Sequence, residues 1–362
     1  MDLSREVSCI RLLRRLLGTN LSEYIAINNN FGVSIIVCCY NSVDRLPATL
    51  DHLKSQVVPE HIPWEVIVVD NGSTDQTAEV ARTLWGDLPG VPFRVVSQPT
   101  PGLIYARIKG FETAKYEFVS FVDDDNWVAP NWVQMVYEKM IEFPQAGQVG
   151  GRSEAVYESD PPIWFKKIPW SFGIGEQAEF EGELGKGAVL WGTGAHRKSA
   201  WLNLQAKGFS PLLTGRKGSQ QLSGEDLEIG YSLLITGWKL YYTPDLVFKH
   251  YMPSSRFNKR KYLQMRRGYG RSSVYLNMYR LLFSDKVLRV TVNRRVWNKK
   301  IADLIRNFIT HPKVLVDALT WKDTLDPEVL MMHKHIGSFC ERMRLLAKVD
   351  AIEKNLQNIF YE

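Results

Sequence analysis

Three adjacent carboxylates, Asp123, Asp124 and Asp125, are the residues of this chain best suited to chemistry. They follow the apolar run Phe118–Val122 and precede Trp127, so they stand in an apolar frame. Neighbouring carboxylates repel one another, and a hard divalent cation such as Mg²⁺ or Mn²⁺ would offset that repulsion. Alternate side chains of an extended segment point the same way, so Asp123 and Asp125 can serve one site. The alternative is an acidic loop in solvent.

A second acidic pair, Glu225 and Asp226, stands where a helix is expected to begin. A carboxylate at a helix start can act as the general base toward a hydroxyl nucleophile. It can equally be structural, because acidic residues in the first turn interact favourably with the helix dipole. The local sequence does not separate these two interpretations.

Three further residues have side chains that suit a ligand site. Asp70 follows the apolar run Val66–Val69 and can accept a hydrogen bond from a base or a ribose, or form a turn. Arg107 can reach a diphosphate or make a surface salt bridge. His250 suits a metal ligand, a phosphate contact or a buried histidine, and its local sequence favours the buried role.

These residues need a scaffold, and strand-like and helix-like stretches alternate from residue 33 onward. The strand-like runs are 33–39, 64–69, 93–96 and 118–122, and the helix-like stretches are 42–56, 76–85, 102–114 and 132–143. This alternation predicts an α/β fold with an open, mostly parallel sheet flanked by helices. Ligands bind such sheets beyond the carboxyl ends of the strands, where Tyr40, Asn41, Asp70 and the acidic cluster fall. No Gly-x-Gly-x-x-Gly follows the first strand and there is no P-loop, which disfavours dinucleotide and ATP sites.

Composition and charge divide the chain. Its 362 residues are 45% hydrophobic and 12% aromatic, which excludes a mainly disordered protein. The 4 cysteines have no metal-ligand spacing, so we expect buried free thiols in a reducing compartment. The net charge is +6, but residues 256–362 hold 22 Lys and Arg against 10 Asp and Glu. We therefore expect an N-terminal helical extension (1–30), a catalytic domain (31–255) and a basic helical C-terminal region (256–362).

The basic region begins with a run of Lys and Arg between Arg256 and Arg271. A basic amphipathic helix there would suit an anionic membrane surface, and the alternatives are packing on the catalytic domain or a dimer surface. No nucleic-acid partner is expected, because no stacking motif accompanies the charge. No apolar run approaches the roughly 20 residues that span a bilayer, and the N-terminus lacks the apolar core of a secretory signal. We expect a cytoplasmic protein or a peripheral one on the cytoplasmic face of a membrane.

The chain resembles the family 2 glycosyltransferases, inverting enzymes with the GT-A fold. The segments that carry the resemblance are Val33–Asn41, Val66–Thr77, Gly102–Gly110, Phe118–Trp132 and Ser223–His250. It covers about residues 32–255. One departure is Ile108, where many members have Asn, so a polar role at that position is not expected.

The resemblance implies a role for each candidate residue. Asp226 would deprotonate the acceptor hydroxyl, with Glu225 in support. Asp125 and Asp123 would bind Mn²⁺ or Mg²⁺ as an Asp-x-Asp element, and His250 would help to hold the metal. The residues implied in binding the nucleotide-sugar are Tyr40, Asn41, Asp70, Arg107, Asp123 and Asp124.

The resemblance also implies the partners. The donor would be a nucleotide-sugar, with UDP or GDP expected, and the acceptor a saccharide or a lipid-linked saccharide. Aromatic residues suitable for an acceptor platform are Trp164, Phe165, Trp170, Phe172 and the segment 191–194. The alternative functions are a nucleotidyl- or phosphotransferase and a non-catalytic nucleotide- or glycan-binding protein.

Overall fold

The computed structural model describes residues 30–86, 90–185, 187–217, 220–288 and 294–361. The helical extension predicted for residues 1–30, with Cys9, therefore lies outside the described residues apart from its last position. Cys38 and Cys39 are free thiols within the sheet, whereas Cys340 is a free thiol that is exposed. The expectation of buried thiols is therefore wrong for Cys340.

Among the described residues, nine strands form one mixed sheet at the centre of the molecule. They are β1 (Val33–Cys39), β2 (Trp64–Asp70), β3 (Phe93–Ser97), β4 (Phe118–Asp123), β5 (Asn126–Val128), β6 (Ala146–Tyr157), β7 (Gly182–Glu183), β8 (Gly194–Arg197) and β11 (Lys239–Met252). The order is β3-β2-β1-β4-β8-β6-β11-β5, and β7 pairs with β11 outside this path. The short strands β9 (Arg216–Lys217) and β10 (Gln220–Gln221) form a separate hairpin.

The four strands predicted from the sequence form the parallel half of this sheet, with β1 between β2 and β4 and with β3 beside β2. The α/β class is thus confirmed. The other half is mixed, because β8 runs antiparallel to both β4 and β6. The sequence did not indicate β6, since its glycines have poor strand propensity. One of them, Gly151, is required because a Cβ there would collide with the backbone of Leu246 on β11.

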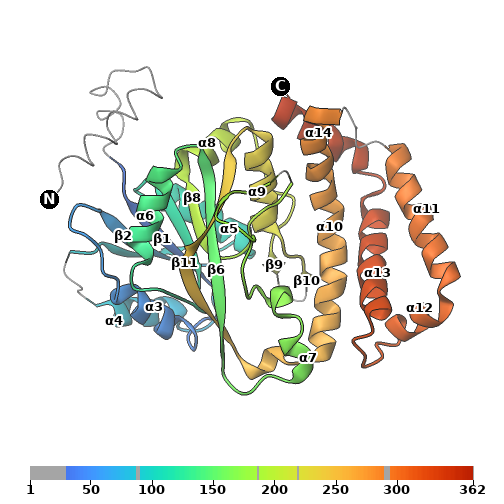
Figure 1. Cartoon of the computed structure of the whole chain (residues 1–362), viewed down its shortest axis with the longest axis horizontal. Helices are drawn as coiled ribbons and strands as arrows, with labels where there is room; N and C mark the ends of the chain where they lie inside the picture. Colours follow the sequence, from blue (N-terminus) through green and yellow to red (C-terminus); the bar gives the residue numbers. More distant parts are fainter. Residues whose placement is uncertain (1–29, 87–89, 186, 218–219, 289–293, 362) are drawn as a thin grey trace.

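Helices cover both faces of the sheet (Figure 1). One face packs against α3 (Leu46–Lys54), α4 (Thr77–Trp85) and α6 (Trp132–Glu142), and the other against α5 (Leu103–Thr113), α8 (Lys198–Ala206) and α9 (Glu225–Ile235). Alternation along β1 explains this arrangement, because Val33, Ile35 and Val37 join the first apolar cluster and Ile36 joins the second. A short helix, α7 (Ile163–Lys166), and two single-turn segments, η1 (Pro169–Phe172) and η2 (Ser254–Arg256), lie in the connections.

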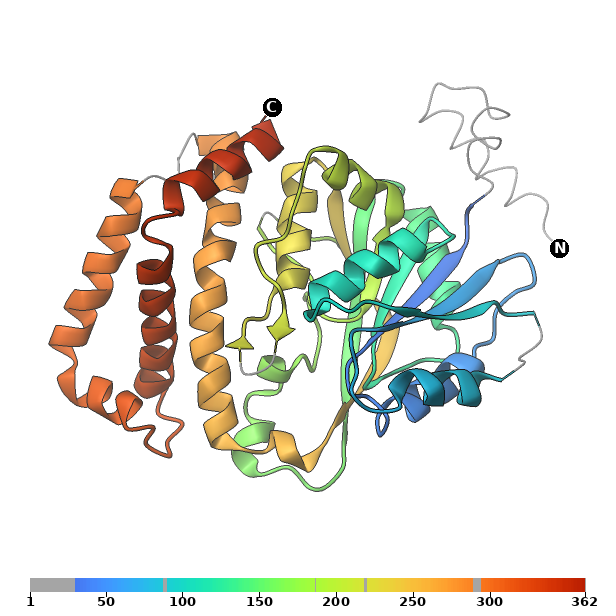
Figure 2. The same ribbon diagram turned by 180° about the vertical axis from the view of Figure 1, so that it is seen from behind.

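The C-terminal region consists of the helices α10 (Lys259–Leu288), α11 (Arg294–Thr310), α12 (Pro312–Leu319), α13 (Pro327–Leu345) and α14 (Val349–Tyr361). Figures 1 and 2 show α10 alongside α9, with α13 and α11 farther from the sheet. Tyr275 and Tyr279 of α10 belong to the same apolar cluster as Ile229 of α9. The core therefore continues across residue 255. The domain boundary placed there stays a prediction.

Part of the basic run on α10 is used inside this helical region. The guanidinium groups of Arg260 and Arg267 lie 4.2 and 3.8 Å from the centre of the Trp321 ring. Arg267 also donates a hydrogen bond to the carbonyl of Ala318 at 2.9 Å. None of the described helices combines the length and apolar character needed to cross a bilayer.

Candidate active site

Parallel pairing brings two of the predicted carboxylates to one edge of the sheet. Asp70 at the end of β2 is the register partner of Cys39, and Asp123 at the end of β4 is the partner of Cys38. The two aspartates therefore flank the end of β1, at the edge where open α/β sheets bind ligands. Tyr40 follows β1 at this edge, and its side chain is exposed.

Asn41 and Asp70 hold the loops of this edge in place. Asn41 has a φ of +49°, in the left-handed region that Asn tolerates, and its Oδ1 accepts a 2.8 Å hydrogen bond from the backbone N–H of Thr74. Asp70 Oδ1 accepts a 3.0 Å bond from the N–H of Ser73. Both side chains thus shape the surface that a nucleotide would meet.

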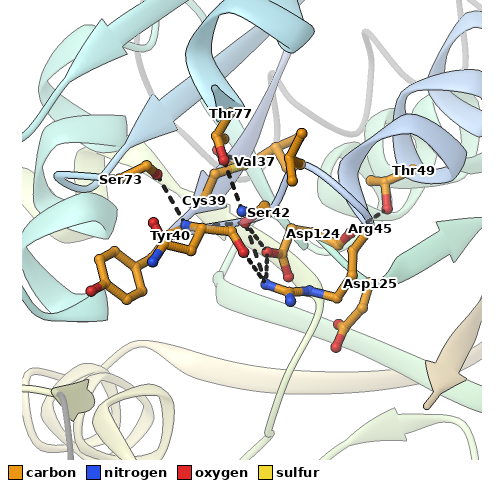
Figure 3. Close-up of polar contacts among 12 residues, drawn as sticks. Val37, Cys39, Tyr40, Ser42, Arg45, Thr49, Ser73, Thr77, Asp124 and Asp125 are labelled. Carbon is orange, nitrogen blue, oxygen red and sulfur yellow. Dashed lines mark hydrogen bonds and ion pairs between the residues drawn. The ribbon is translucent and has the colours of Figure 1, made fainter. Parts of the chain in front are cut away.

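Asp124 faces α3 and the loop after β1 (Figure 3). Its Oδ2 lies 2.7 Å from Nη2 of Arg45 and accepts a hydrogen bond from the Ser42 hydroxyl. Thr49 donates a 2.9 Å bond to the Asp124 carbonyl. Burial and the neighbouring carboxylate of Asp125 raise the pKa of Asp124, while Arg45 opposes that shift.

Asp125 is buried between two basic side chains. Its Oδ2 lies 2.6 Å from Nη2 of Arg256, and its Oδ1 lies 3.6 Å from Nε2 of His250. Burial alone would raise the pKa of Asp125, but His250, when its ring is protonated, and Arg256 hold it below its ordinary value. His250 is half-buried beside Asp125, and its role at a metal stays a prediction.

Asp123 faces the interior charge of Arg107. The Arg107 guanidinium is 2% exposed, lies 5.2 Å from the centre of the Phe121 ring, and comes within 3.9 Å of Glu225. Burial and Asp125 raise the pKa of Asp123, and Arg107 opposes them. Arg107 is therefore a buried counter-charge to Asp123 and Glu225.

Asp226 is half-exposed at the start of α9, whereas Glu225 is buried. Asp226 Oδ2 accepts a 2.8 Å hydrogen bond from the N–H of Gly192. The residue after Gly192, Thr193, lies next to Asp123, because the N–H of Asp123 is 3.5 Å from the Thr193 hydroxyl. The segment 191–194 thus links the end of β4 to the start of α9. Asp123 also interacts electrostatically with Asp226, so the two acidic groups singled out in the sequence share one site.

The chemistry of Asp123, Asp125 and His250 fits a divalent cation, because carboxylate oxygen and imidazole nitrogen are ligands of Mn²⁺. Within the part of the chain that the structure describes, no three His, Cys, Asp or Glu side chains lie close enough to hold a cation by themselves. Oxygen atoms of a diphosphate would complete the shell, as Mg²⁺ sites commonly require. Of these three, Asp125 and His250 are in contact, with 3.6 Å between Oδ1 and Nε2.

The structure adds residues that sequence reasoning missed. Arg45, Thr193 and Arg256 contact the candidate carboxylates or their backbone. From the sequence, Thr193 is considered only within the acceptor platform and Arg256 only as the start of the basic run, and no local pattern links any of the three to the acidic cluster. Among the platform candidates, Phe165 is fully buried core, whereas Trp170 is exposed.

Known proteins resemble part of this chain, and the family match includes Asp123–Asp125 but ends before Asp226 and His250. The family model "Glycosyl transferase family 2" matches residues 34–202. Glycosyltransferase GlyA of Streptococcus pneumoniae serotype 4 is 29% identical over 135 residues, 37% of this chain and 18% of that protein. Glucosyl-dolichyl phosphate glucuronosyltransferase of Haloferax volcanii is 24% identical over 198 residues, 54% of this chain and 61% of that protein. The chain thus spans less than two thirds of either relative.

Among solved structures, residues 1–349 of S. aureus TarS superpose with a TM-score of 0.49 at 18% identity, over 89% of this chain and 91% of that chain.

Proposed function

We propose that this chain, whose residues 34–202 match the model of glycosyl transferase family 2, is an inverting glycosyltransferase. It moves a sugar from a nucleotide-diphospho-sugar to an acceptor hydroxyl in the synthesis of a polysaccharide or glycoconjugate. The observation that carries the proposal is the shared site of Asp123 and Asp226, linked by residues 191–194. In this proposal Asp123 serves the donor side and Asp226 is the base.

The donor side is formed by the loops at the ends of β1, β2 and β4. Tyr40 offers an exposed ring to the nucleobase, and Asn41 and Asp70 fix the loops beside it. Asp124 supports this side through Arg45. We infer UDP or GDP as the nucleotide.

Asp125, Asp123 and His250 would hold Mn²⁺ or Mg²⁺ at the diphosphate. When bound, the cation supplies positive charge to the leaving nucleoside diphosphate. Arg107 lies too deep to replace it, since the guanidinium is almost fully buried. Its role in donor binding is therefore indirect: it balances the charge of Asp123 and Glu225.

Asp226 is the general base in this proposal. The N–H groups of Gly192 and Leu227 donate to its two oxygens, at 2.8 Å each, and so fix the orientation of the carboxylate. It takes the proton of the acceptor hydroxyl while that oxygen attacks the anomeric carbon from the face opposite the leaving group. A single in-line displacement of this kind inverts the anomeric configuration. Glu225 is buried beside Arg107, and in this proposal it assists Asp226 as a second carboxylate at the start of α9.

The acceptor is a saccharide or a lipid-linked saccharide. The relative from Haloferax volcanii is named for a lipid-linked acceptor, which supports the second form. The protein would then work at the cytoplasmic face of a membrane, with the basic side chains of α10 near the lipid. Since Arg260 and Arg267 already lie on Trp321, contact with lipid falls to other residues such as the exposed Lys261.

A panel of UDP- and GDP-sugars tests the proposal, first for donor hydrolysis and then for transfer to saccharide and polyprenyl-diphosphate-saccharide acceptors. We expect release of the nucleoside diphosphate and a product of inverted configuration. Release of diphosphate, or transfer of a phosphoryl or nucleotidyl group, would instead identify the alternative enzyme class.

A further inference from the structure

Each carboxylate of the acidic cluster has an arginine of its own. Asp124 pairs with Arg45 at 2.7 Å and Asp125 with Arg256 at 2.6 Å. The charge of Arg107 is the strongest favourable influence on Asp123. A buried carboxylate without a counter-charge is costly, so these three arginines explain how the cluster is tolerated without a cation.

Arg256 differs from the other two because it also contacts His250. Its Nη2 lies 2.6 Å from Asp125 Oδ2, and its Nη1 lies 3.1 Å from His250 Nε2. A guanidinium can only donate, so in the neutral form of the ring the Nε2 lone pair faces Arg256. At the other ring nitrogen, Nδ1 lies 3.5 Å from the carbonyl of Gly173, which can only accept. Arg256 thus occupies the lone pairs that a metal would use.

The backbone around Arg256 is anchored, while its side chain reaches the site from the solvent side. The N–H and hydroxyl of Ser254 donate to Glu158 at 2.7 and 2.6 Å. The Arg256 side chain is 25% exposed, compared with 7% for Asp125. The guanidinium can therefore leave Asp125 by side-chain rotation, without disturbance of the core.

We propose that Arg256 and the divalent cation are alternative partners of Asp125 and His250, and that Arg256, once displaced, binds the diphosphate of the donor. This inference rests on the proposed function. A cation and a guanidinium at one carboxylate oxygen repel each other strongly at such short range. The phosphate oxygens offer Arg256 a new charge-assisted partner. The protein would therefore hold the cation weakly until the donor arrives.

The test compares wild type with Arg256→Gln, which removes the charge and keeps a polar side chain. Mn²⁺ alone is titrated first, with free Mn²⁺ followed by electron paramagnetic resonance. We expect the variant to bind Mn²⁺ at least roughly tenfold more tightly, because a competing charge is gone. UDP and GDP are then titrated at saturating Mn²⁺ by calorimetry, and we expect the variant to bind the nucleotide roughly tenfold more weakly.

Two controls accompany these titrations. Lys166→Gln makes the same charge change at an exposed ion pair with Asp160 and should leave both affinities unchanged. Arg256→Lys keeps the charge without the fork of donors and should fall between wild type and Arg256→Gln. Melting curves establish that all variants are folded. Opposite changes in the two affinities cannot come from a general loss of structure.

Several results would overturn the inference. Mn²⁺ affinity that is unchanged or weaker in Arg256→Gln excludes the competition, and so does a lack of Mn²⁺ binding by both proteins. Tighter Mn²⁺ binding with unchanged nucleotide affinity excludes the transfer of Arg256 to the diphosphate. If wild type binds neither nucleotide, the proposed function fails, while the titration with Mn²⁺ alone still decides the competition.

Discussion

Arg45 and Asp124 form a 2.7 Å ion pair that joins the first turn before α3 to the turn after β4. The two residues are far apart in the sequence, and the pair holds one wall of the candidate site to another. The Asp124 side chain is only 14% exposed, so loss of Arg45 would leave a largely buried carboxylate without its counter-charge.

We predict that Arg45→Met lowers the free energy of unfolding by about 1–3 kcal/mol, since the cost of an unpaired carboxylate rises with burial. Arg152→Met is a matched control: Arg152 is also 35% exposed and also makes a 2.7 Å ion pair, but its partner Glu154 is 46% exposed. The control should cost less than about 1 kcal/mol. Urea unfolding measures both, and equal losses would contradict the structural role of the Arg45–Asp124 pair.

Asp226→Asn should reduce sugar transfer by roughly 100-fold or more, because the amide keeps the shape of the side chain but cannot take a proton. Binding of UDP or GDP should change little. Asp160→Asn, at a side chain that is 87% exposed, serves as control and should retain full activity. Near-normal transfer by Asp226→Asn would exclude it as the base.

His196 makes stability depend on pH. Burial, with the nearby charge of Arg107, lowers the pKa of His196 to about 3. Among the described residues, neither ring nitrogen has a hydrogen-bond partner, and the ring packs edge-on against Phe111 and Phe121. The folded state keeps the ring neutral, whereas the unfolded chain takes up a proton below about pH 6.5. The free energy of unfolding is therefore not reduced by His196 above about pH 6.5, and it falls as the pH falls from 6.5 toward 3.

We predict that His196→Phe removes this part of the acid sensitivity. Below about pH 6.5 the uptake of one proton by the unfolded chain lowers the free energy of unfolding of the wild type by about 1.4 kcal/mol per pH unit. The variant lacks this loss, so it should become more stable relative to the wild type by about 1.4 kcal/mol for each pH unit. Urea unfolding at pH 7.5, 6.5 and 5.5 measures it. Glu228, whose pKa burial raises to about 7, contributes equally to both proteins and cancels. A pH-independent difference would contradict the prediction.

The close approach of α10 and α13 depends on two glycines. A Cβ on Gly337 would collide with the carbonyl of Arg267, and one on Gly270 with the carbonyl of Lys334. We expect Gly337→Ala to lower the melting temperature by several degrees, since the two helices must separate to relieve the clash. Gly185→Ala, where a Cβ has no described atom within 4 Å, should have almost no effect. Equal melting temperatures for both variants would exclude this packing constraint.

The parallel half of the sheet and its ligand edge could be predicted from the sequence. The apolar runs that became β1, β2 and β4 are short and continuous, and such runs form buried strands in open α/β sheets. Because each strand ends where its apolar run ends, the hydrophobic pattern is enough to place Asp70 and Asp123 at one edge of the sheet. The order of the motifs added the resemblance to family 2 glycosyltransferases and, with it, the proposed base Asp226.

The mixed half of the sheet could not be predicted in this way. β6 contains Gly147, Gly150 and Gly151, which weaken the local strand signal, yet its neighbours require them. Whether α10 lies on a membrane or on the protein was also undecided by its basic, apolar pattern. Its contact with α9 and α13 depends on shapes that meet only in the folded chain.

The positions of the carboxylates at strand ends follow from the local hydrophobic pattern, because that pattern places the ends of the strands. Which arginine balances each carboxylate depends on how the chain folds in three dimensions. Arg256 reaches Asp125 across 131 positions of sequence, from a segment that composition alone assigns to a basic appendage. A charge pair depends on distance in space, and the paths of β11 and η2 set that distance.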